Sequence, residues 1–266
     1  MIEFEDVHFS YRDQKILQGI SFTIPQGETV AVLGASGSGK TTILRLLLGL
    51  MKPDSGRILV DDIDIAPMSE NALINVRRTM GVVFQFGALF DSLTVGNNVA
   101  FPLRELRTMT EEQIIDRVTE AIQQVGLDPH VLDQMPSELS GGMNRRVAVA
   151  RAIVGYPKIM LYDEPTTGLD PMACEVVCDL VNELKDDIGV TSVFVTHQLA
   201  AAFRVASHFI MMRDGHLIFD GTASDMRKTE DPYIAQFIRW ELGGLIDGTG
   251  EKSDMERSQG RVARPE

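Results

Sequence analysis

The sequence has few cysteines, no excess of positive charge and no long apolar run, and each absence excludes a class of protein. Only two cysteines occur among 266 residues, so neither a disulfide-stabilised scaffold nor a cysteine-rich metal site is expected. The formal net charge is −13 and the basic residues are scattered, which argues against a basic face for nucleic acid or for an anionic membrane surface. Because no stretch reaches about eighteen apolar residues, we expect no direct membrane span.

The remaining composition is that of an ordinary soluble globular protein, with 44% hydrophobic and 24% charged residues. A chain of this length can bury a sizeable core. Residues 1–5 lack the basic start and apolar middle of a signal peptide, so the protein is expected to stay in the cytoplasm. Cys174 and Cys178 lie four residues apart on one face of an expected helix, where we expect free, buried or half-buried thiols.

A glycine-rich loop lies between a short apolar strand, residues 29–33, and an apolar, helix-forming run over residues 41–49. It has the full G-x-x-x-x-G-K-[ST] spacing of a phosphate-binding loop. Its backbone N–H groups and the helix dipole favour a polyanion, with Lys40 available for the outer phosphates and the Thr41 hydroxyl for Mg²⁺. The alternative, a turn that only caps a helix, is disfavoured by the strand and helix around it. The residues expected to bind the nucleotide are Gly34, Ser36, Gly37, Ser38, Gly39, Lys40, Thr41 and Thr42.

Alternating strands and helices predict an α/β fold with a mostly parallel sheet. Antiparallel strands are expected over residues 2–24, ahead of the phosphate loop. A helical lobe over about 86–155 is expected to be inserted into the α/β core. Within it, residues 110–113 have the form of a capping box, and apolar residues then recur at helical spacing as far as Gly126. Residues 86–103, by contrast, show an irregular pattern.

The second half of the chain continues the alternation. It predicts strands over 158–163 and 190–195, a helix over about 172–187 and a hairpin over 210–219. A short amphipathic helix over 231–240 either packs on its own domain or reaches a second subunit. Residues 246–266 are polar and aperiodic, and we expect a disordered tail there.

Polar residues follow three further predicted strands. Because the carboxyl ends of parallel strands share one edge of a sheet, these residues and the phosphate loop converge if the strands are neighbours. Asp163 can then hold Mg²⁺ opposite Thr41, and Glu164 can orient or deprotonate the attacking water. His197 is placed to bond the γ-phosphate, and Gln85 to complete the metal shell. Taken singly, a glutamine or histidine after a strand is more often a satisfied surface residue, and paired acids often merely end a strand.

A second glycine site, residues 139–143, precedes another helix-forming run and offers a second helix N-terminus fit for an anion. Its plain alternative is a glycine-rich helix start. In order along the chain, the phosphate loop, Gln85, Leu139-Ser140-Gly141-Gly142, Asp163-Glu164-Pro165, Gly168-Leu169-Asp170 and His197 resemble the nucleotide-binding subunit of ABC transporters. The resemblance covers residues 1 to about 225.

This resemblance implies a P-loop NTPase core, an ABC ATPase domain over residues 1–245, ATP and Mg²⁺ as cofactors, and a head-to-tail homodimer that encloses two ATP molecules. In such a dimer Ser140, Gly141 and Gly142 contact the γ-phosphate of the partner's ATP, and Asp170 lies at the dimer interface. Tyr11 stacks on adenine, for which its flat ring is suited; its alternative is an ordinary turn aromatic. One departure is Met143, where the family usually has glutamine, so that one amide contact is lost.

Residues 84–95 and 98–105, together with Gly142-Met143, are similar to the ATPase of Mla-type (Mce-associated) lipid transporters. That similarity implies phospholipid movement between the bacterial inner and outer membranes, through a transmembrane permease and a membrane-anchored Mce-type lipid-binding protein. The chain would then lie at the cytoplasmic face of the inner membrane, with residues 84–105 receiving the permease's coupling helices or packing between the lobes. Two alternatives stay open: a transporter for another cargo, such as an amino acid or ion, and a soluble ABC ATPase without a permease.

Overall fold

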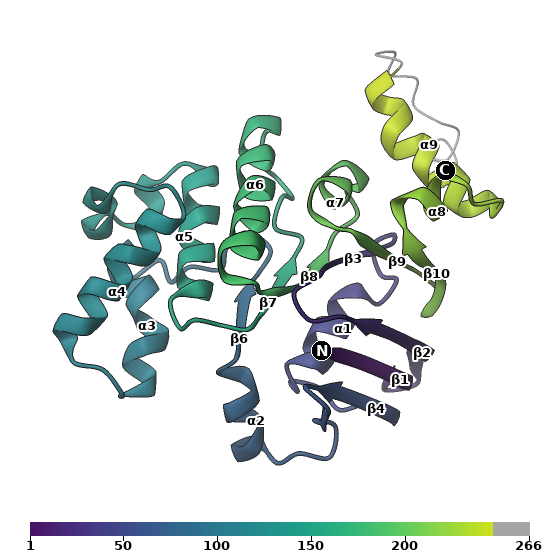
Figure 1. Cartoon of the computed structure of the whole chain (residues 1–266), viewed down its shortest axis with the longest axis horizontal. Helices are drawn as coiled ribbons and strands as arrows, with labels where there is room; N and C mark the ends of the chain where they lie inside the picture. The colour runs from purple at the N-terminus through teal and green to yellow at the C-terminus, as the bar shows by residue number, and fades with distance from the viewer. Residues whose placement is uncertain (247–266) are drawn as a thin grey trace, which may run out of the picture.

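A six-stranded sheet runs through the middle of the computed structural model, which describes residues 1–246 (Figure 1). Its strand order is β10-β9-β3-β8-β7-β6. The bounds are β3 Thr29–Leu33, β6 Met80–Val83, β7 Ile159–Asp163, β8 Thr191–Val195, β9 His208–Arg213 and β10 His216–Thr222. All neighbours are parallel except β10, which pairs antiparallel with β9. The predicted mostly parallel sheet and the C-terminal hairpin are therefore confirmed.

A second sheet is antiparallel and has the order β2-β1-β4-β5. Its strands are β1 Ile2–Tyr11, β2 Gln14–Ile24, β4 Ser55–Val60 and β5 Ile63–Asp64. The antiparallel strands expected at the N-terminus are thus confirmed, and β4 and β5 join them from beyond the phosphate loop. An apolar cluster that includes Ile43 and Leu46 of α1 (Lys40–Leu47) fills the space between the two sheets.

The period of two along β3 explains how this central strand packs on both faces. Val30 and Val32 belong to the cluster shared with α1 and the antiparallel sheet, whereas Ala31 and Leu33 belong to the cluster on the opposite face. All five residues of β3 are buried. A strand covered on both faces is mostly apolar, as β3 is after Thr29, and the phosphate loop therefore starts from a fully buried support.

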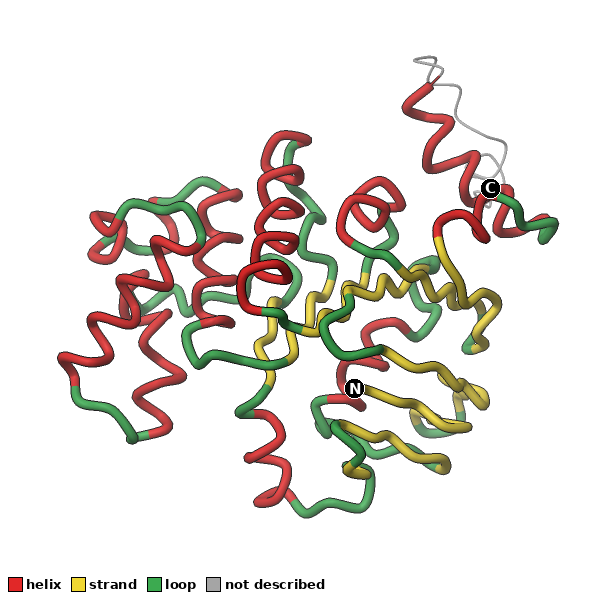
Figure 2. Tube along the Cα trace, in the orientation of Figure 1, coloured by secondary structure: helices red, strands yellow, loops and turns green. Residues whose placement is uncertain are grey.

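Helices surround the sheets, as Figure 2 shows in red. Besides α1 they are α2 Glu70–Arg77, α3 Val95–Leu106, α4 Glu111–Gln124, α5 Gly141–Ile153, α6 Pro171–Ile188, α7 Leu199–Val205, α8 Ala223–Arg227 and α9 Pro232–Ile246, with short 3-10 turns at Pro129–Asp133 and Pro136–Glu138. Helices α3, α4 and α5 gather at one end of the molecule, and α8 and α9 lie at the other (Figure 1).

Within the expected helical lobe, the capping box is confirmed: Thr110 and Gln113 bond reciprocally at the start of α4. Helix α3 differs from the irregular pattern expected over residues 86–103. It is capped by the Thr94 side chain and contains Pro102. One apolar cluster joins α3, α4 and α5 to Tyr162 of β7 and Phe194 of β8, so these helices share their core with the sheet. The boundaries of the lobe at 86 and 155 stay a prediction.

The C-terminal helix is longer than the sequence pattern indicated. It was expected over 231–240, and α9 runs from Pro232 to Ile246. A disordered tail was predicted over 246–266. Apart from Ile246, the last residue of α9, that segment lies outside the described residues. Among residues 1–246 no helix combines the length and apolar character that a membrane crossing requires.

Candidate active site

Three glycines with positive φ shape the loop between β3 and α1. Gly34, Gly37 and Gly39 have φ angles of 147°, 81° and 105°. A Cβ atom on Gly34 would lie 2.4 Å from the carbonyl oxygen of Met212, and one on Gly39 would lie 2.8 Å from the side chain of Leu17. The loop therefore packs directly against β9 and β2, and only glycine allows that approach.

The N-terminus of α1 faces this loop and carries no acidic residue in its first turn. Its amides and the loop amides are donors for an anion. The Ser38 hydroxyl is buried and has no hydrogen-bond partner among the described residues. Ser36 is exposed on the loop, and Thr42 is half-buried in the first turn of α1. An orphaned hydroxyl inside a ring of N–H donors fits a bound polyphosphate.

Lys40 is held with its charge inside the loop. Its side chain is 6% exposed, and Nζ donates to the carbonyl oxygens of Gly34 at 2.7 Å and Ala35 at 3.0 Å. Nζ also lies 3.9 Å from Oε1 of Glu164. Burial lowers the pKa of Lys40, and the carboxylates of Glu164 and Asp163 oppose that shift. The ammonium of Lys40 is thus held between the loop carbonyls and Glu164.

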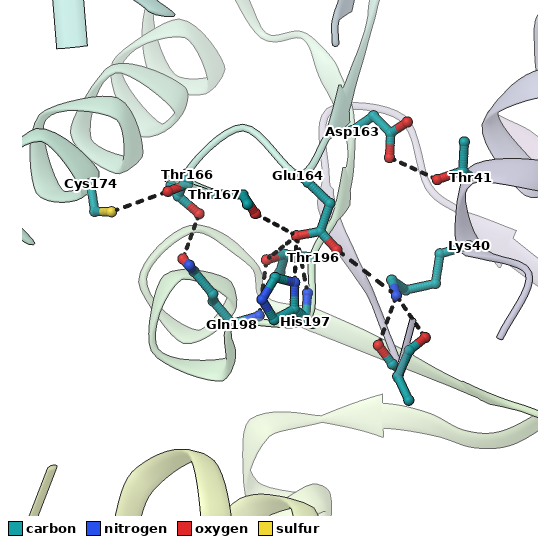
Figure 3. Close-up of polar contacts among 12 residues, drawn as sticks. Lys40, Thr41, Asp163, Glu164, Thr166, Thr167, Cys174, Thr196, His197 and Gln198 are labelled. Carbon is teal, nitrogen blue, oxygen red and sulfur yellow. Dashed lines mark hydrogen bonds and ion pairs between the residues drawn. The ribbon is translucent and has the colours of Figure 1, made fainter. Parts of the chain in front are cut away.

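The predicted pair of oxygen ligands forms a direct contact. Thr41 Oγ1 donates to Asp163 Oδ1 at 3.0 Å, across the space between α1 and β7 (Figure 3). Burial raises the pKa of Asp163, while the Thr41 hydrogen bond lowers it. A hydroxyl and a half-buried carboxylate are hard oxygen donors, which Mg²⁺ prefers. The residues present therefore fit a magnesium ion bound together with phosphates.

Glu164 is the centre of the polar cluster in Figure 3. Its Oε2 accepts hydrogen bonds from Thr167 Oγ1 at 3.1 Å and Thr196 Oγ1 at 3.3 Å, and it lies 2.9 Å from Nδ1 of His197. The backbone of Glu164 has a φ of 50°, in the left-handed region that a glutamate rarely adopts. A strained backbone that aims one carboxylate into a ring of donors is typical of a functional site.

The strand order satisfies the condition on which the predicted convergence depends. β3, β8, β7 and β6 are successive neighbours, so the phosphate loop, His197, Asp163 and Gln85 follow adjacent strands. Contacts join the first three groups. Gln85 is exposed two residues beyond β6, and Tyr11 ends β1 with its side chain 58% exposed. Their roles toward metal and adenine stay predictions.

The second glycine site forms a separate pocket of about 540 Å³. Ser140, Gly141 and Gly142 line it together with Asp170, and none of its lining residues belongs to the phosphate loop. Ser140 Oγ accepts a hydrogen bond from the backbone N–H of Met143 and so caps α5, while Asp170 caps α6 in the same way through Ala173. Two helix N-termini thus open into one pocket.

Two hydroxyl residues contact Glu164 in roles that the sequence did not predict. Thr167 lies three residues after Glu164 and bonds back to it, and Thr196 reaches it from the position just after β8. The buried residue Thr166, which precedes Thr167, donates to Oε1 of Gln198 at 2.7 Å and so fixes the turn after His197. The only sequence signal was the presence of hydroxyl residues beside the acidic pair and the histidine.

The family model for ABC transporters matches residues 17–167. The chain belongs to this family, and it is an ATP-binding cassette ATPase. It is 40% identical over 248 residues to the Intermembrane phospholipid transport system ATP-binding protein MlaF of Escherichia coli (strain K12), covering 93% of this chain and 90% of that protein.

Two other similarities cover most of the chain. The Probable ribonucleotide transport ATP-binding protein mkl of Mycobacterium leprae (strain TN) is 37% identical over 258 residues, or 97% of this chain and 74% of that protein. Among solved structures, the dimeric bacterial ABC transporter cassette MJ0796 superposes with a TM-score of 0.77 at 33% identity, covering 84% of this chain and 98% of that one. The expected fold, with its P-loop NTPase core, is therefore confirmed.

Proposed function

We propose that this chain is the ATP-hydrolysing motor subunit of a bacterial ABC transporter complex that moves phospholipids between the inner and outer membranes. The observation that carries the proposal is the contact network of Lys40, Thr41, Asp163, Glu164 and His197 at one edge of the sheet. The network occurs in a chain 40% identical to a protein named for intermembrane phospholipid transport.

The phosphate loop and Lys40 bind the phosphates of ATP, and Thr41, Asp163 and Gln85 would hold Mg²⁺. The ion would supply positive charge that offsets the charge of the phosphates. No cluster of three or more histidine, cysteine or acidic side chains suited to a metal occurs in residues 1–246. A magnesium site needs no such cluster, because one or two protein oxygens, water and the phosphates complete it.

Glu164 acts on the water that attacks the γ-phosphate, as a base or by orienting it. His197 and the hydroxyls of Thr167 and Thr196 keep its Oε2 atom fixed. Oε1, 3.9 Å from Lys40 Nζ, is the oxygen that meets the water. His197 is 46% exposed at its side chain, so it can also reach the γ-phosphate.

Two copies of the chain close head to tail around two ATP molecules. The separation of the Ser140–Gly142 pocket from the phosphate loop supports this arrangement, because the pocket can then take a γ-phosphate held by the other copy. Asp170 lines the same pocket and lies at the interface. Tyr11, exposed at the end of β1, stacks on the adenine.

A second, larger and more apolar cavity supports a permease partner. It has a volume of about 690 Å³ and is lined by exposed aromatic residues together with other residues of α2, β6, α3 and α5. The aromatic residues are Phe84, Phe90 and Phe101. Apolar concavities of this kind accept helices of a partner protein. The complex would include a membrane-anchored Mce-type lipid-binding protein and hold this chain at the cytoplasmic face of the inner membrane.

The experiment is to purify the tagged full chain from membranes and to identify the bound proteins and lipids. Co-purification of a Mce-associated permease with phospholipid supports the proposal. Co-purification of a periplasmic binding protein for amino acids, ions or another solute would indicate a different cargo but would leave the motor role unchanged. Recovery in the soluble fraction with ribosomes would favour an ABC ATPase without a permease.

A further inference from the structure

Arg145 is a buried cation on α5 whose guanidinium contacts two loops distant in sequence. Its Nη1 donates to the carbonyl oxygen of Phe84 at 3.0 Å, and its Nη2 donates to that of Thr167 at 3.2 Å. The first carbonyl directly precedes Gln85, and the second belongs to the residue whose hydroxyl bonds Glu164. Arg145 is 3% exposed, so it is a fixed part of the interior.

The surroundings of Arg145 make its two hydrogen bonds costly to lose. Burial lowers the pKa of the guanidinium, because the charged form has given up water. No carboxylate pairs with it among the described residues, so the carbonyl dipoles of the two loops stabilise its charge. Its Nε is buried with no hydrogen-bond partner in residues 1–246. The guanidinium thus donates to the two carbonyl oxygens, while the hydrogen bond that its Nε could donate is not made.

The loop that carries Gln85 needs such a support. Three successive residues, Phe86, Gly87 and Ala88, have positive φ angles of 62°, 80° and 49°. Residues other than glycine adopt this conformation when the surrounding structure imposes it. Arg151, also on α5, donates to the carbonyl oxygens of Ala88 and Gly87, both at 2.9 Å. Two arginines of one helix thus hold the strained turn from its two ends.

The two loops also lie close to each other at a second place. A Cβ atom on Gly168 would lie 3.6 Å from the ring of Phe86, which places that ring beside the segment after Thr167. Phe86 is otherwise 71% exposed. The contact shows that the loops are adjacent at a second point, independent of the guanidinium.

We propose that Arg145 is a positioning residue for hydrolysis, which ties the loop of Gln85 to the Thr167 segment that holds Glu164. The inference rests on the proposed roles of Gln85 and Glu164. A displacement of Gln85 on binding metal and nucleotide passes through the Phe84 carbonyl to the guanidinium and then to Thr167. Glu164 thereby reaches its working position only when the Gln85 loop is in place.

The test uses Arg145→Lys in the full chain, with Arg151→Lys as the matched control. An ammonium is a point charge that cannot span the two carbonyls as the planar fork does. Hydrogen exchange is followed in two segments, residues 84–90 and 166–170, whose amides Gly87 N–H and Leu169 N–H are hydrogen-bonded. Arg145→Lys is expected to speed exchange about tenfold in both segments, and Arg151→Lys in the first segment alone.

Kinetics supply a readout that a general loss of packing would not give. For Arg145→Lys, kcat is expected to fall about tenfold while the Kd for ATP stays within about twofold, because the phosphate loop is untouched. Arg145→Gln, which keeps one NH2 group without charge, replaces the lysine variant if that one does not fold. Faster exchange in one segment only, or an unchanged kcat in a folded variant, overturns the proposal. Hydrogen exchange does not depend on turnover. It therefore tests the link that Arg145 makes between the two loops even if the wild-type chain proved to have no ATPase activity.

Discussion

The carboxylate of Glu164 and the imidazole of His197 lie 2.9 Å apart, which joins the end of β7 to the end of β8 in one polar contact. On the other side of Glu164, its second oxygen is 3.9 Å from the ammonium of Lys40. Glu164 therefore lies between the phosphate loop and the histidine. A change at any of the three residues is expected to act at a different stage of ATP turnover.

Replacing Glu164 by glutamine is expected to preserve ATP binding and to slow hydrolysis by about 10²- to 10⁴-fold. The amide keeps the size and part of the hydrogen bonding of the side chain, but it cannot accept a proton from water. Phosphate release measures the rate, and light scattering after gel filtration with ATP should show dimers accumulating. Turnover at the wild-type rate would remove Glu164 from the mechanism.

Lys40→Ala is expected to lower the affinity for ATP by about 100-fold or more, so that binding is no longer detected at ordinary ATP concentrations. The variant removes the only side-chain ammonium seen within the phosphate loop. Calorimetric titration with ATP is the measurement. Lys158→Ala, an exposed lysine just before β7, is the control and should keep wild-type affinity. An equal loss in both variants would point to bulk charge instead of a phosphate contact.

Gly34→Ala is expected to destabilise the fold by more than about 2 kcal/mol, because its Cβ would lie 2.4 Å from the Met212 carbonyl oxygen and β9 would have to move. Gly37→Ala is the matched control. Its φ of 81° is also positive, but nothing lies within 4 Å of the added Cβ, so about 1 kcal/mol of backbone strain is expected. Urea unfolding followed by circular dichroism compares them; equal losses would contradict the packing argument.

Glu28 is expected to make stability depend on pH in the acid range. The Ser207 hydroxyl, and to a lesser degree Lys185, lower the pKa of Glu28 below its ordinary value of 4.5. Because the pKa is lowered in the folded state, the ionised carboxylate stabilises the fold above its ordinary pKa. That stabilisation is lost as the pH falls through the folded-state pKa. Glu28→Gln should reduce stability at pH 7 by up to about 1 kcal/mol, since the carboxylate is partly exposed.

The control for that experiment is Glu112→Gln, which changes an exposed acid in the first turn of α4. Thermal unfolding between pH 3 and pH 7 should show a shallower acid dependence for Glu28→Gln than for the control variant. Parallel curves for the two variants would exclude Glu28 as a pH-linked contact.

Much of the fold follows from local patterns. The apolar run of β3, the capping box of α4 and the helical pattern over 172–187 each predicted an element that the structure has. The candidate site was predictable where a residue type is demanded by a spacing, as at Lys40 and Thr41. The neighbouring order of the strands then brought Asp163 and His197 together with them.

Other features depend on contacts that no local pattern encodes. Helix α3 escaped detection because Gly96 and Pro102 are poor helix residues, and its stability comes from packing. The buried Asn98 side chain, for example, donates to the carbonyls of Phe90, Leu93 and Thr94. Arg145 looked like an ordinary charged residue of a helix, because its two partners are carbonyl oxygens 61 and 22 residues away.

The placement of β3 inside the central sheet bears on how the protein is made. This strand is translated early, yet its two neighbours begin at Thr191 and His208. The nascent polypeptide thus carries an apolar segment without ladder partners through most of its synthesis on the ribosome. Premature termination anywhere before those later strands would leave that segment as a seed for aggregation, and chaperone capture is expected to be strongest during that interval.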